Sequence, residues 1–404
     1  MFINQLVFPL VDIALLIIAL GLLIPIAVLF IECSAASLPN RPQVSNAGVS
    51  RPKTAVLIPA HNEEDVIGAT LKTLLPQLTE QDQLLVIADN CSDQTATVAR
   101  ELGATVVERQ NLELRGKGYA LDYGMGFIKA DPPEVVVLVD ADCIVYPGTI
   151  ERITHLAAAK QRPVQSTYLM TQPDNPALKD LLSMLAVKFK NTVRPSGLNR
   201  MGLPSLLTGS GMAFPWSVIS KISLAGSKTT DDMQLAVDLS IAGHPPIYCQ
   251  QAQVTGRLMK ESSATSQRAR WEHGHIEMLL VEFPRTLAAA IRQRSFNLLA
   301  LALELSVPPL SLLVMAWIVA TGVALLAGAL GGAWIAAIVL LIEGLLMFIS
   351  IVLGWAKFCR QDLPVLTFLA VPFYLLWKIP LYIAFFVQPQ YRWLRTERDA
   401  VDAQ

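Results

Sequence analysis

The sequence predicts an α/β domain with a parallel sheet, flanked on both sides by transmembrane helices. Charged residues make up only 16% of the 404 residues and hydrophobic residues 53%, whereas soluble proteins average about 25% charged. This apolar excess is concentrated at the two ends of the chain. Between the ends, short runs rich in Val and Ile alternate with helical patterns, which is typical of a parallel sheet covered on both faces.

The first apolar run, residues 6–31, is interrupted by one charged residue, Asp12. It exceeds the roughly 20 residues that a membrane helix needs. Residues 1–5 contain no basic side chain, which argues against a cleaved signal peptide. We therefore expect a transmembrane signal anchor over residues 1–32 and a linker rich in Pro, Ser and Asn over residues 33–53.

A second apolar region covers residues 296–390, and a short tail, 391–404, follows it. Two stretches in this region, 308–330 and 334–355, have the length and composition of transmembrane spans. The stretch before them, 296–307, is expected to be an amphipathic helix on the membrane surface. The region therefore contributes two spans and at least one interfacial helix.

The last apolar segment, 364–387, is divided by Pro372, Lys378 and Pro380, and three arginines follow it. The basic residues favour a segment that re-enters the membrane or lies in its interface. A full fourth span is the alternative.

Basic residues lie beside the ends of the predicted spans: Arg41, Arg51, Lys53, Arg285, Arg292, Arg294, Lys357 and Arg360. Because such residues favour the cytoplasmic side, we expect the N-terminus outside and the central domain in the cytoplasm. The protein would then be integral to a bacterial inner membrane or plasma membrane. Five cysteines without a CxxC pair fit a reduced compartment. A net charge of −1 argues against a nucleic-acid partner.

The central domain is expected over residues 54–295. Its strands are predicted at 54–58, 83–89, 104–108 and 134–139, and its first helices at 63–77, 93–102 and 118–130. Ligands of such sheets bind beyond the carboxyl ends of the strands. Polar residues follow three of the predicted strands, at 59–64, 89–93 and 140–142. Asn62 and Asp93 could instead be helix N-caps, and Asp140 could simply end a strand.

Two of these residues, Asp140 and Asp142, suggest a metal site. They are separated by one residue, so in extended backbone their side chains point to the same face. Two such close carboxylates repel each other unless a cation lies between them or one of them is protonated, and oxygen ligands favour Mg²⁺ or Mn²⁺. Such a cation commonly binds substrate phosphates. Lys117, between Gly116 and Gly118 at a predicted helix start, also suits a phosphate or nucleotide, although a flexible basic loop is the alternative.

Six motifs together resemble the membrane-bound branch of family 2 glycosyltransferases, which includes cellulose, hyaluronan and chitin-oligosaccharide synthases and ceramide glucosyltransferases. They are Pro59-Ala60-His61-Asn62-Glu63, Ser92-Asp93, Gly116-Lys117-Gly118, Asp140-Ala141-Asp142, Thr230-Asp231-Asp232 and Gln267-Arg268-Ala269-Arg270-Trp271. The resemblance covers residues 54–271. His61 stands where the family usually has Tyr, and Asp231 where it usually has Glu.

The resemblance implies a GT-A fold, which is a Rossmann-like, mixed but mostly parallel sheet, and an inverting transfer from a nucleotide sugar. Asp232 would be the general base, Asp142 the most direct ligand of Mg²⁺ or Mn²⁺, and Asp140 a contact to the ribose or the metal. Glu63 and Asp93 resemble nucleoside contacts, which suggests UDP. The nucleotide set is Pro59, His61, Glu63, Asp93, Lys117, Asp140 and Ala141.

A second set of residues is implied for the diphosphate and the acceptor. It consists of Gln267, Arg268, Arg270, Trp271, Gly209, Ser210, Gly211 and Asp231. Arginine forks suit phosphate and an indole face suits a sugar ring. Each feature also has a plainer interpretation: the arginines and Trp271 could form a basic membrane-surface helix, and Asp232 could be a helix-terminal acid.

The predicted function is transfer of a sugar from a nucleotide-sugar donor to a growing polysaccharide or a lipid-linked glycan at the bilayer. A processive synthase and a single-addition glycolipid synthase both fit. A glycoside hydrolase does not fit, because its two carboxyl groups must lie about 5–10 Å apart on either side of the glycosidic bond. Two residues separated by one position at the end of one strand cannot do this. A non-catalytic scaffold or a transporter is the remaining alternative, and the few scattered intramembrane charges argue against transport. Any partner subunit is left open.

Overall fold

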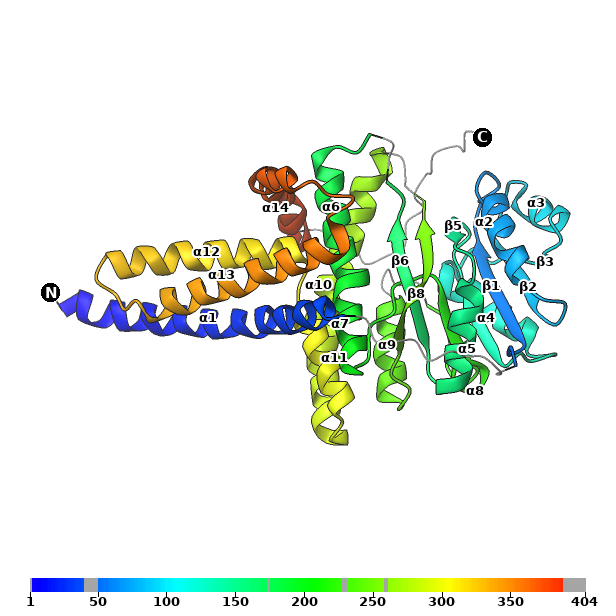
Figure 1. Cartoon of the computed structure of the whole chain (residues 1–404), viewed down its shortest axis with the longest axis horizontal. Helices are drawn as coiled ribbons and strands as arrows, with labels where there is room; N and C mark the ends of the chain where they lie inside the picture. The colour runs from blue at the N-terminus through cyan, green and yellow to red at the C-terminus, as the bar shows by residue number, and fades with distance from the viewer. Residues whose placement is uncertain (1, 40–49, 173–174, 227–230, 258–260, 388–404) are drawn as a thin grey trace. The chain divides into compact units, whose positions relative to one another are not determined.

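The computed structural model describes residues 2–39, 50–172, 175–226, 231–257 and 261–387. The chain divides into two compact units (Figure 1). Of the described residues, 50–172, 175, 203–226, 231–257 and 261–274 form the sheet unit, and 2–39, 176–202 and 275–387 form the helical unit. Residues 176–202 thus belong to the helical unit, although in sequence they lie between segments of the sheet unit.

The sheet unit is built on eight strands among its described residues, in the order β3-β2-β1-β4-β7-β6-β8-β5. The strands are β1 Thr54–Ala60, β2 Gln83–Asp89, β3 Thr105–Arg109, β4 Val135–Leu138, β5 Cys143–Val145, β6 Val164–Met170, β7 Met212–Pro215 and β8 Ile247–Gly256. β1 to β4 pair in parallel, β7 runs antiparallel to β4 and β6, β6 pairs in parallel with β8, and β5 is antiparallel to β8. The prediction of a mixed, mostly parallel sheet is confirmed.

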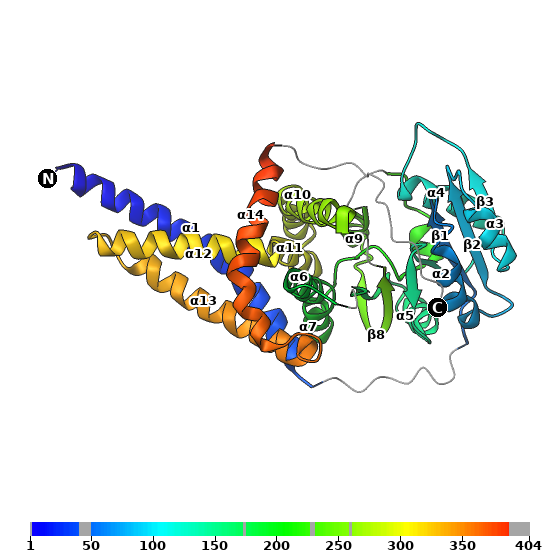
Figure 2. The same cartoon turned by 90° about the horizontal axis from the view of Figure 1, so that it is seen from above.

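Helices cover both faces of this sheet. They are α2 Ile67–Leu74 with the 3₁₀ turn η1 Leu75–Gln77, α3 Thr95–Glu101, α4 Lys117–Ile128, α5 Thr149–Lys160, α8 Trp216–Ile219 and α9 Asp231–Ile241. Alternate side chains of β1 face opposite sides: Val56 joins a core with residues of α2, α3 and α5, whereas Leu57 faces α4 at Gly124. Figure 2 shows α4 and α2 on opposite sides of β1.

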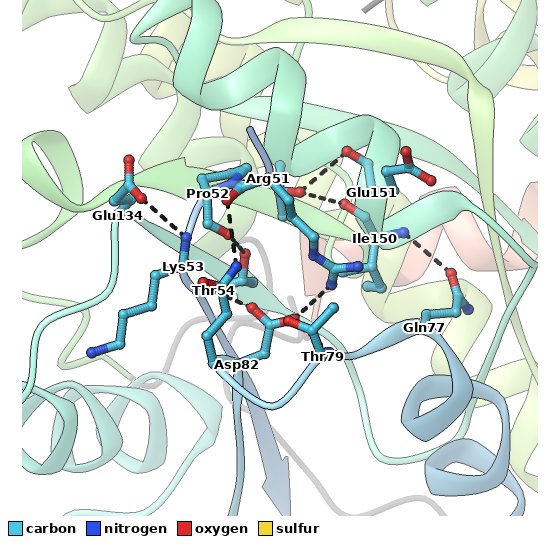
Figure 3. Close-up of polar contacts among 12 residues, drawn as sticks. Arg51, Pro52, Lys53, Thr54, Gln77, Thr79, Asp82, Glu134, Ile150 and Glu151 are labelled. Atoms are coloured by element: carbon cyan, nitrogen blue, oxygen red, sulfur yellow. Dashed lines mark hydrogen bonds and ion pairs between the residues drawn. The ribbon is translucent and has the colours of Figure 1, made fainter. Parts of the chain in front are cut away.

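The amino-terminal edge of β1 is held by side-chain hydrogen bonds (Figure 3). The carboxylate of Asp82 accepts from the Arg51 guanidinium at 2.8 Å, the Thr54 N–H at 3.0 Å and the Thr79 N–H at 2.9 Å. Glu134 accepts from the Lys53 N–H at 3.1 Å. These bonds fix the position at which the chain enters β1. The polar residues that the sequence analysis singled out lie at the opposite, carboxyl-terminal end of the strands.

The helical unit contains the long apolar helices. Its elements are α1 Phe2–Ser37, α6 Leu178–Lys188, the π-helical turn η2 Phe189–Val193, α7 Arg194–Met201, α11 Phe296–Ser306, α12 Leu310–Ala329, α13 Ile335–Gly354, the π-helical turn η3 Trp355–Cys359, the 3₁₀ turn η4 Val365–Ala370 and α14 Val371–Val387. α10, Glu261–Gln293, begins in the sheet unit and ends in the helical unit. α1, α12 and α13 pack against one another (Figure 1).

Four helical stretches of the described residues are long and apolar enough to cross a membrane. They are Pro9–Ser37, Leu310–Ala329, Ile335–Cys359 and Val365–Phe385. The first three coincide with the predicted spans. The fourth coincides with the segment predicted to re-enter or lie in the interface, and by length and composition it also meets the alternative of a full span. The predicted surface helix is α11, most of whose later residues are buried.

One buried ion cluster joins three elements of the helical unit. The Arg194 guanidinium of α7 bonds Glu32 of α1 at 2.6 Å and pairs with Glu304 of α11 at 2.8 Å, and all three side chains are at most 5% exposed. α7 lies so close to α1 that a Cβ on Gly197 would be 2.0 Å from the Glu32 carbonyl oxygen. Charges buried this deeply depend on one another, because each loses its water on folding.

We expect Arg194→Met to lower the free energy of unfolding of the full-length protein by about 3–5 kcal/mol, because it leaves two buried carboxylates without their cation. Thermal unfolding in detergent measures the effect. Arg292→Met, which removes an exposed arginine from α10, is the control and is expected to leave the midpoint almost unchanged. Equal midpoints for the two variants would show that the cluster contributes nothing to stability.

Candidate functional site

Two carboxylates meet at the carboxyl end of β4. All four residues of β4 are buried, and Asp140 and Asp142 follow just after it. Ligand atoms of Asp140, Asp142 and Cys143 all lie within 4.8 Å of one another. Asp142 is only 6% exposed, while Asp140 is half-buried. Carboxylate oxygens at this separation suit a hard divalent cation, so the residues present fit Mg²⁺ or Mn²⁺.

The third member of this cluster, Cys143, is a protonated thiol. Burial raises the pKa of Cys143 well above its usual range, and the nearby carboxylates Asp142 and Asp140 raise it further. Its thiol donates to Asp142 Oδ1 at 3.8 Å. Cys143 is therefore a hydrogen-bond donor to Asp142, and the oxygen atoms of Asp140 and Asp142 are the atoms of this cluster that could hold a divalent cation.

The turn Gly209-Ser210-Gly211 lies directly against these carboxylates. The Asp140 N–H donates to Ser210 Oγ at 3.0 Å, and the Gly211 N–H donates to the Leu138 carbonyl at 3.0 Å. Gln165 of β6 holds the turn from the other side, since its amide donates to the Ser210 carbonyl at 2.9 Å. Sequence patterns implied the turn for the acceptor side, and the structure brings it to the predicted metal ligands.

Lys117, at the start of α4, reaches the same place. Its ammonium pairs with Asp140 Oδ1 and donates to the Gly209 carbonyl at 2.5 Å. Burial alone would lower the pKa of Lys117, but Asp140 and, to a smaller extent, Asp232 raise it above its usual value. The chain approaches closely because Gly118 has no side chain: a Cβ there would be 2.3 Å from the Leu224 carbonyl oxygen.

Asp232, near the start of α9, is close to the turn as well. A Cβ built on Gly209 would be 3.4 Å from Asp232 Oδ2, and Asp232 is half-buried. Thr230 lies outside the described residues, as does the side chain of Asp231. The predicted base, metal ligands and phosphate-binding lysine are thus gathered around one turn.

The segment Gln267 to Trp271 is helical, as predicted, and forms part of the first half of α10. Arg270 is 5% exposed, and burial lowers its pKa below the usual value. Gln267, Arg268 and Trp271 are half-buried. These side chains are therefore more buried than a helix that only lies on a membrane surface would require.

A family model described as glycosyltransferase-like family 2 matches residues 52–295. The chain belongs to this family. It is therefore a glycosyltransferase, as the sequence motifs predicted.

Other known proteins resemble parts of this glycosyltransferase. A probable glycosyltransferase of Bacillus subtilis, YdaM, is 36% identical over 99 residues, which is 22% of this chain and 23% of that protein. The 4,4'-diaponeurosporenoate glycosyltransferase of Staphylococcus haemolyticus is 32% identical over 99 residues, 24% of this chain and 25% of that protein. The matched region thus spans about a quarter of the length of these two relatives.

The fold itself resembles a solved structure. A mannosyltransferase from Pyrobaculum calidifontis, PcManGT, solved in complex with GDP-Man and Mn²⁺, aligns with a TM-score of 0.52 at 18% identity. The alignment covers 86% of this chain and 100% of that one. Together with the family match it confirms the predicted GT-A fold.

In this glycosyltransferase the loops after β1 and β2 are bonded to each other. The His61 Nδ1 lies 2.7 Å from the Asp89 carbonyl oxygen, and the Glu63 N–H donates to Thr95 Oγ1 at 2.7 Å. The Asp93 carboxylate accepts from the Thr95 N–H at 3.0 Å and the Glu64 N–H at 3.2 Å. The N-cap of α3 is Gln94 rather than Asp93, so Asp93 does not act as the helix N-cap, and its carboxylate instead joins the start of α3 to the loop after β1.

Sequence reasoning missed the partner of Asp89. Arg109, the last residue of β3, bonds Asp89 Oδ1 at 2.6 Å and the Leu114 carbonyl at 2.8 Å, and both charged side chains are at most 10% exposed. Arg109 also lies over the Tyr119 ring, 5.9 Å from its centroid. One available signal was its place: it ends a strand beside β2, so it reaches the edge where the other polar residues lie.

We expect Gly211→Ala to lower the free energy of unfolding by about 2–4 kcal/mol, from left-handed backbone strain and steric overlap. Gly211 has a φ of +67°, and a Cβ would be 2.1 Å from Ser166 Oγ and 2.6 Å from Val254 Cγ2. Gly243→Ala is the control, because Gly243 has a φ of +92° but nothing within 4 Å of an added Cβ. Thermal unfolding should show the larger loss in Gly211→Ala, and similar losses would refute a close-packed turn.

Proposed function

We propose that this glycosyltransferase is an inverting membrane enzyme. It transfers a sugar from a nucleotide diphosphate donor, with UDP as the expected nucleotide, to a growing polysaccharide or a lipid-linked glycan at the cytoplasmic face. The observation that carries the proposal is the convergence of Asp140, Asp142, Lys117 and Asp232 around the turn at Gly209. This transfer requires two carboxylates that can hold a metal ion, a positively charged side chain for the phosphates, and a separate carboxylate that acts as a base and takes a proton.

The donor side is formed by the carboxylates after β4. Asp142, which is buried, would hold Mg²⁺ or Mn²⁺ most directly, and Asp140 would share the metal or contact the ribose. The bound cation would offset the charge that develops on the departing diphosphate. A neighbouring fold solved with GDP-Man and Mn²⁺ supports a nucleotide sugar and a divalent cation. Pro59, His61, Glu63, Asp93, Lys117 and Ala141 complete the nucleotide set.

The acceptor side is formed by Asp232 and the turn beside it. Asp232 takes the proton of the acceptor hydroxyl as that hydroxyl attacks the sugar. A general base acts only within hydrogen-bond reach of the proton that it takes, and the Gly209 to Gly211 turn has no side chain at either end to block an approaching hydroxyl. Asp231 belongs to the same binding set as four residues of α10, which bind the diphosphate and the sugar acceptor. These four residues are Gln267, Arg268, Arg270 and Trp271.

Membrane attachment follows from the four apolar helices. The basic residues beside them support an outer N-terminus and a cytoplasmic sheet unit. The residues assigned above are compatible with both a processive synthase and a single-addition glycolipid synthase. Gel or thin-layer sizing of the product of the purified enzyme distinguishes them, since a ladder excludes the single-addition enzyme.

We expect Asp232→Asn to lower kcat by about 100-fold or more, because a general base contributes about 10²–10⁴ to a rate. Nucleotide release from a panel of UDP- and GDP-sugars with Mg²⁺ or Mn²⁺ measures it, and the donor KM should change little. Asp238→Asn is the matched control, the same change on the same helix, and should keep wild-type turnover.

Equal turnover of wild type and Asp232→Asn would remove Asp232 as the base. Asp142→Asn should abolish the response to added Mn²⁺, and turnover that stays metal-dependent in this variant would remove Asp142 as a ligand.

A further inference from the structure

Lys117 pairs with one of the two carboxylates to which the metal is assigned. Its Nζ contacts Asp140 Oδ1 and donates to the Gly209 carbonyl at 2.5 Å. The side chain of Lys117 is 34% exposed and that of Asp140 25% exposed. This ion pair is therefore accessible to an incoming ligand, unlike the sealed pair of Asp89 and Arg109, whose side chains are at most 10% exposed.

The charges around Lys117 make its place informative. The Lys117 ammonium contacts Asp140, and Asp232 is near enough to act on its charge as well. Asp142 is related to this pair only in that its ligand atom lies within 4.8 Å of that of Asp140. A divalent cation that approaches Asp140 therefore finds that carboxylate already compensated, and it also meets the repulsion of the ammonium. A diphosphate changes this balance, because it brings negative charge that can pair with both cations at once.

We propose that Lys117 is a positioning residue that competes with the divalent cation for Asp140 until the donor binds, when its ammonium moves from Asp140 to the donor diphosphate. The inference rests on the proposed function, because it takes Asp140 and Asp142 as the metal ligands. On this proposal the site binds the metal weakly without nucleotide and tightly when nucleotide is bound. Such coupling is reciprocal, so each ligand strengthens the binding of the other by the same factor.

The same movement reaches the acceptor side. When the ammonium leaves Asp140 it also leaves the Gly209 carbonyl, which belongs to the turn that lies against Asp232. Arrival of the donor thus alters the hydrogen bonding of the turn beside the base.

Mn²⁺ binding to the full-length protein in detergent tests the proposal, with free Mn²⁺ measured by electron paramagnetic resonance. Titrations are made with Mn²⁺ alone and with UDP or GDP added. Lys117→Met removes the ammonium, and Lys117→Gln removes the charge but keeps an N–H donor for Gly209. Lys129→Met is the control, because it removes one exposed positive charge just past the other end of α4.

Both Lys117 variants are expected to bind Mn²⁺ alone on the order of 10-fold more tightly than wild type, since a neighbouring positive charge is gone. UDP or GDP should then increase Mn²⁺ affinity by a smaller factor than in wild type. Lys129→Met should match wild type in both titrations. A purely structural ion pair would leave Mn²⁺ affinity where it is or weaken it.

Unchanged or weaker binding of Mn²⁺ alone in Lys117→Met overturns the inference. If thermal unfolding shows that Lys117→Met does not fold, the same comparison with Lys117→Gln decides. Absence of Mn²⁺ binding in wild type with and without nucleotide, or wild-type binding in Asp142→Asn, instead overturns the metal site of the proposed function. The two failures are thereby distinguishable.

Discussion

The carboxyl end of β4 is the place on which the rest of the site depends. β4 is buried, pairs in parallel with β1 and antiparallel with β7, and so lies where the direction of the sheet reverses. The chain after it must turn between two sheet halves, and the Gly209 to Gly211 turn, just before β7, meets it there. The bond from the Asp140 N–H to Ser210 Oγ joins the two segments. Asp140 and Asp142 themselves lie in a turn rather than in extended backbone, and the bond from the Cys143 N–H to the Asp140 carbonyl at 3.3 Å brings the two residues together.

Much of the first half of the sheet could be predicted because its signals are local. β1 to β4 lie within two residues of the predicted strands, since each is a short apolar run that ends at a polar residue. The helix predicted from residue 63 begins at Ile67 instead. Residues 64–66 form a turn instead, in which the N–H groups of Val66 and Ile67 both bond the Glu63 carbonyl. The bonds from the Glu63 and Glu64 N–H groups to Thr95, the first residue of α3, and to Asp93 join this turn to a distant segment, which no local pattern predicts.

The site shows the same division. Asp140, Asp142, Lys117 and Asp232 could be proposed from short motifs, since each motif carries its own spacing. Gln165, which supports the turn through the Ser210 carbonyl, belongs to no motif. Its role arises only because β6 pairs with β7 and β8, and pairing between strands distant in sequence leaves no local pattern. Arg109, whose bond to Asp89 joins β3 to β2, was missed for the same reason. Cys143 directly follows Asp142 in the sequence, and a single cysteine in this place forms no motif of its own.

Several buried carboxylates of this chain are each paired with a positively charged side chain from a segment distant in sequence. Asp89 has Arg109, and Glu32 and Glu304 have Arg194. In both cases the ions are almost fully buried. This suits a permanent structural role, because separating the ions would leave an unpaired charge buried away from water. The pair of Lys117 and Asp140 is partly exposed, and it lies at the proposed metal site. Separating it costs less than separating a buried pair, since water and an incoming cation or diphosphate can take over each partner, and this suits it to change partners during a reaction.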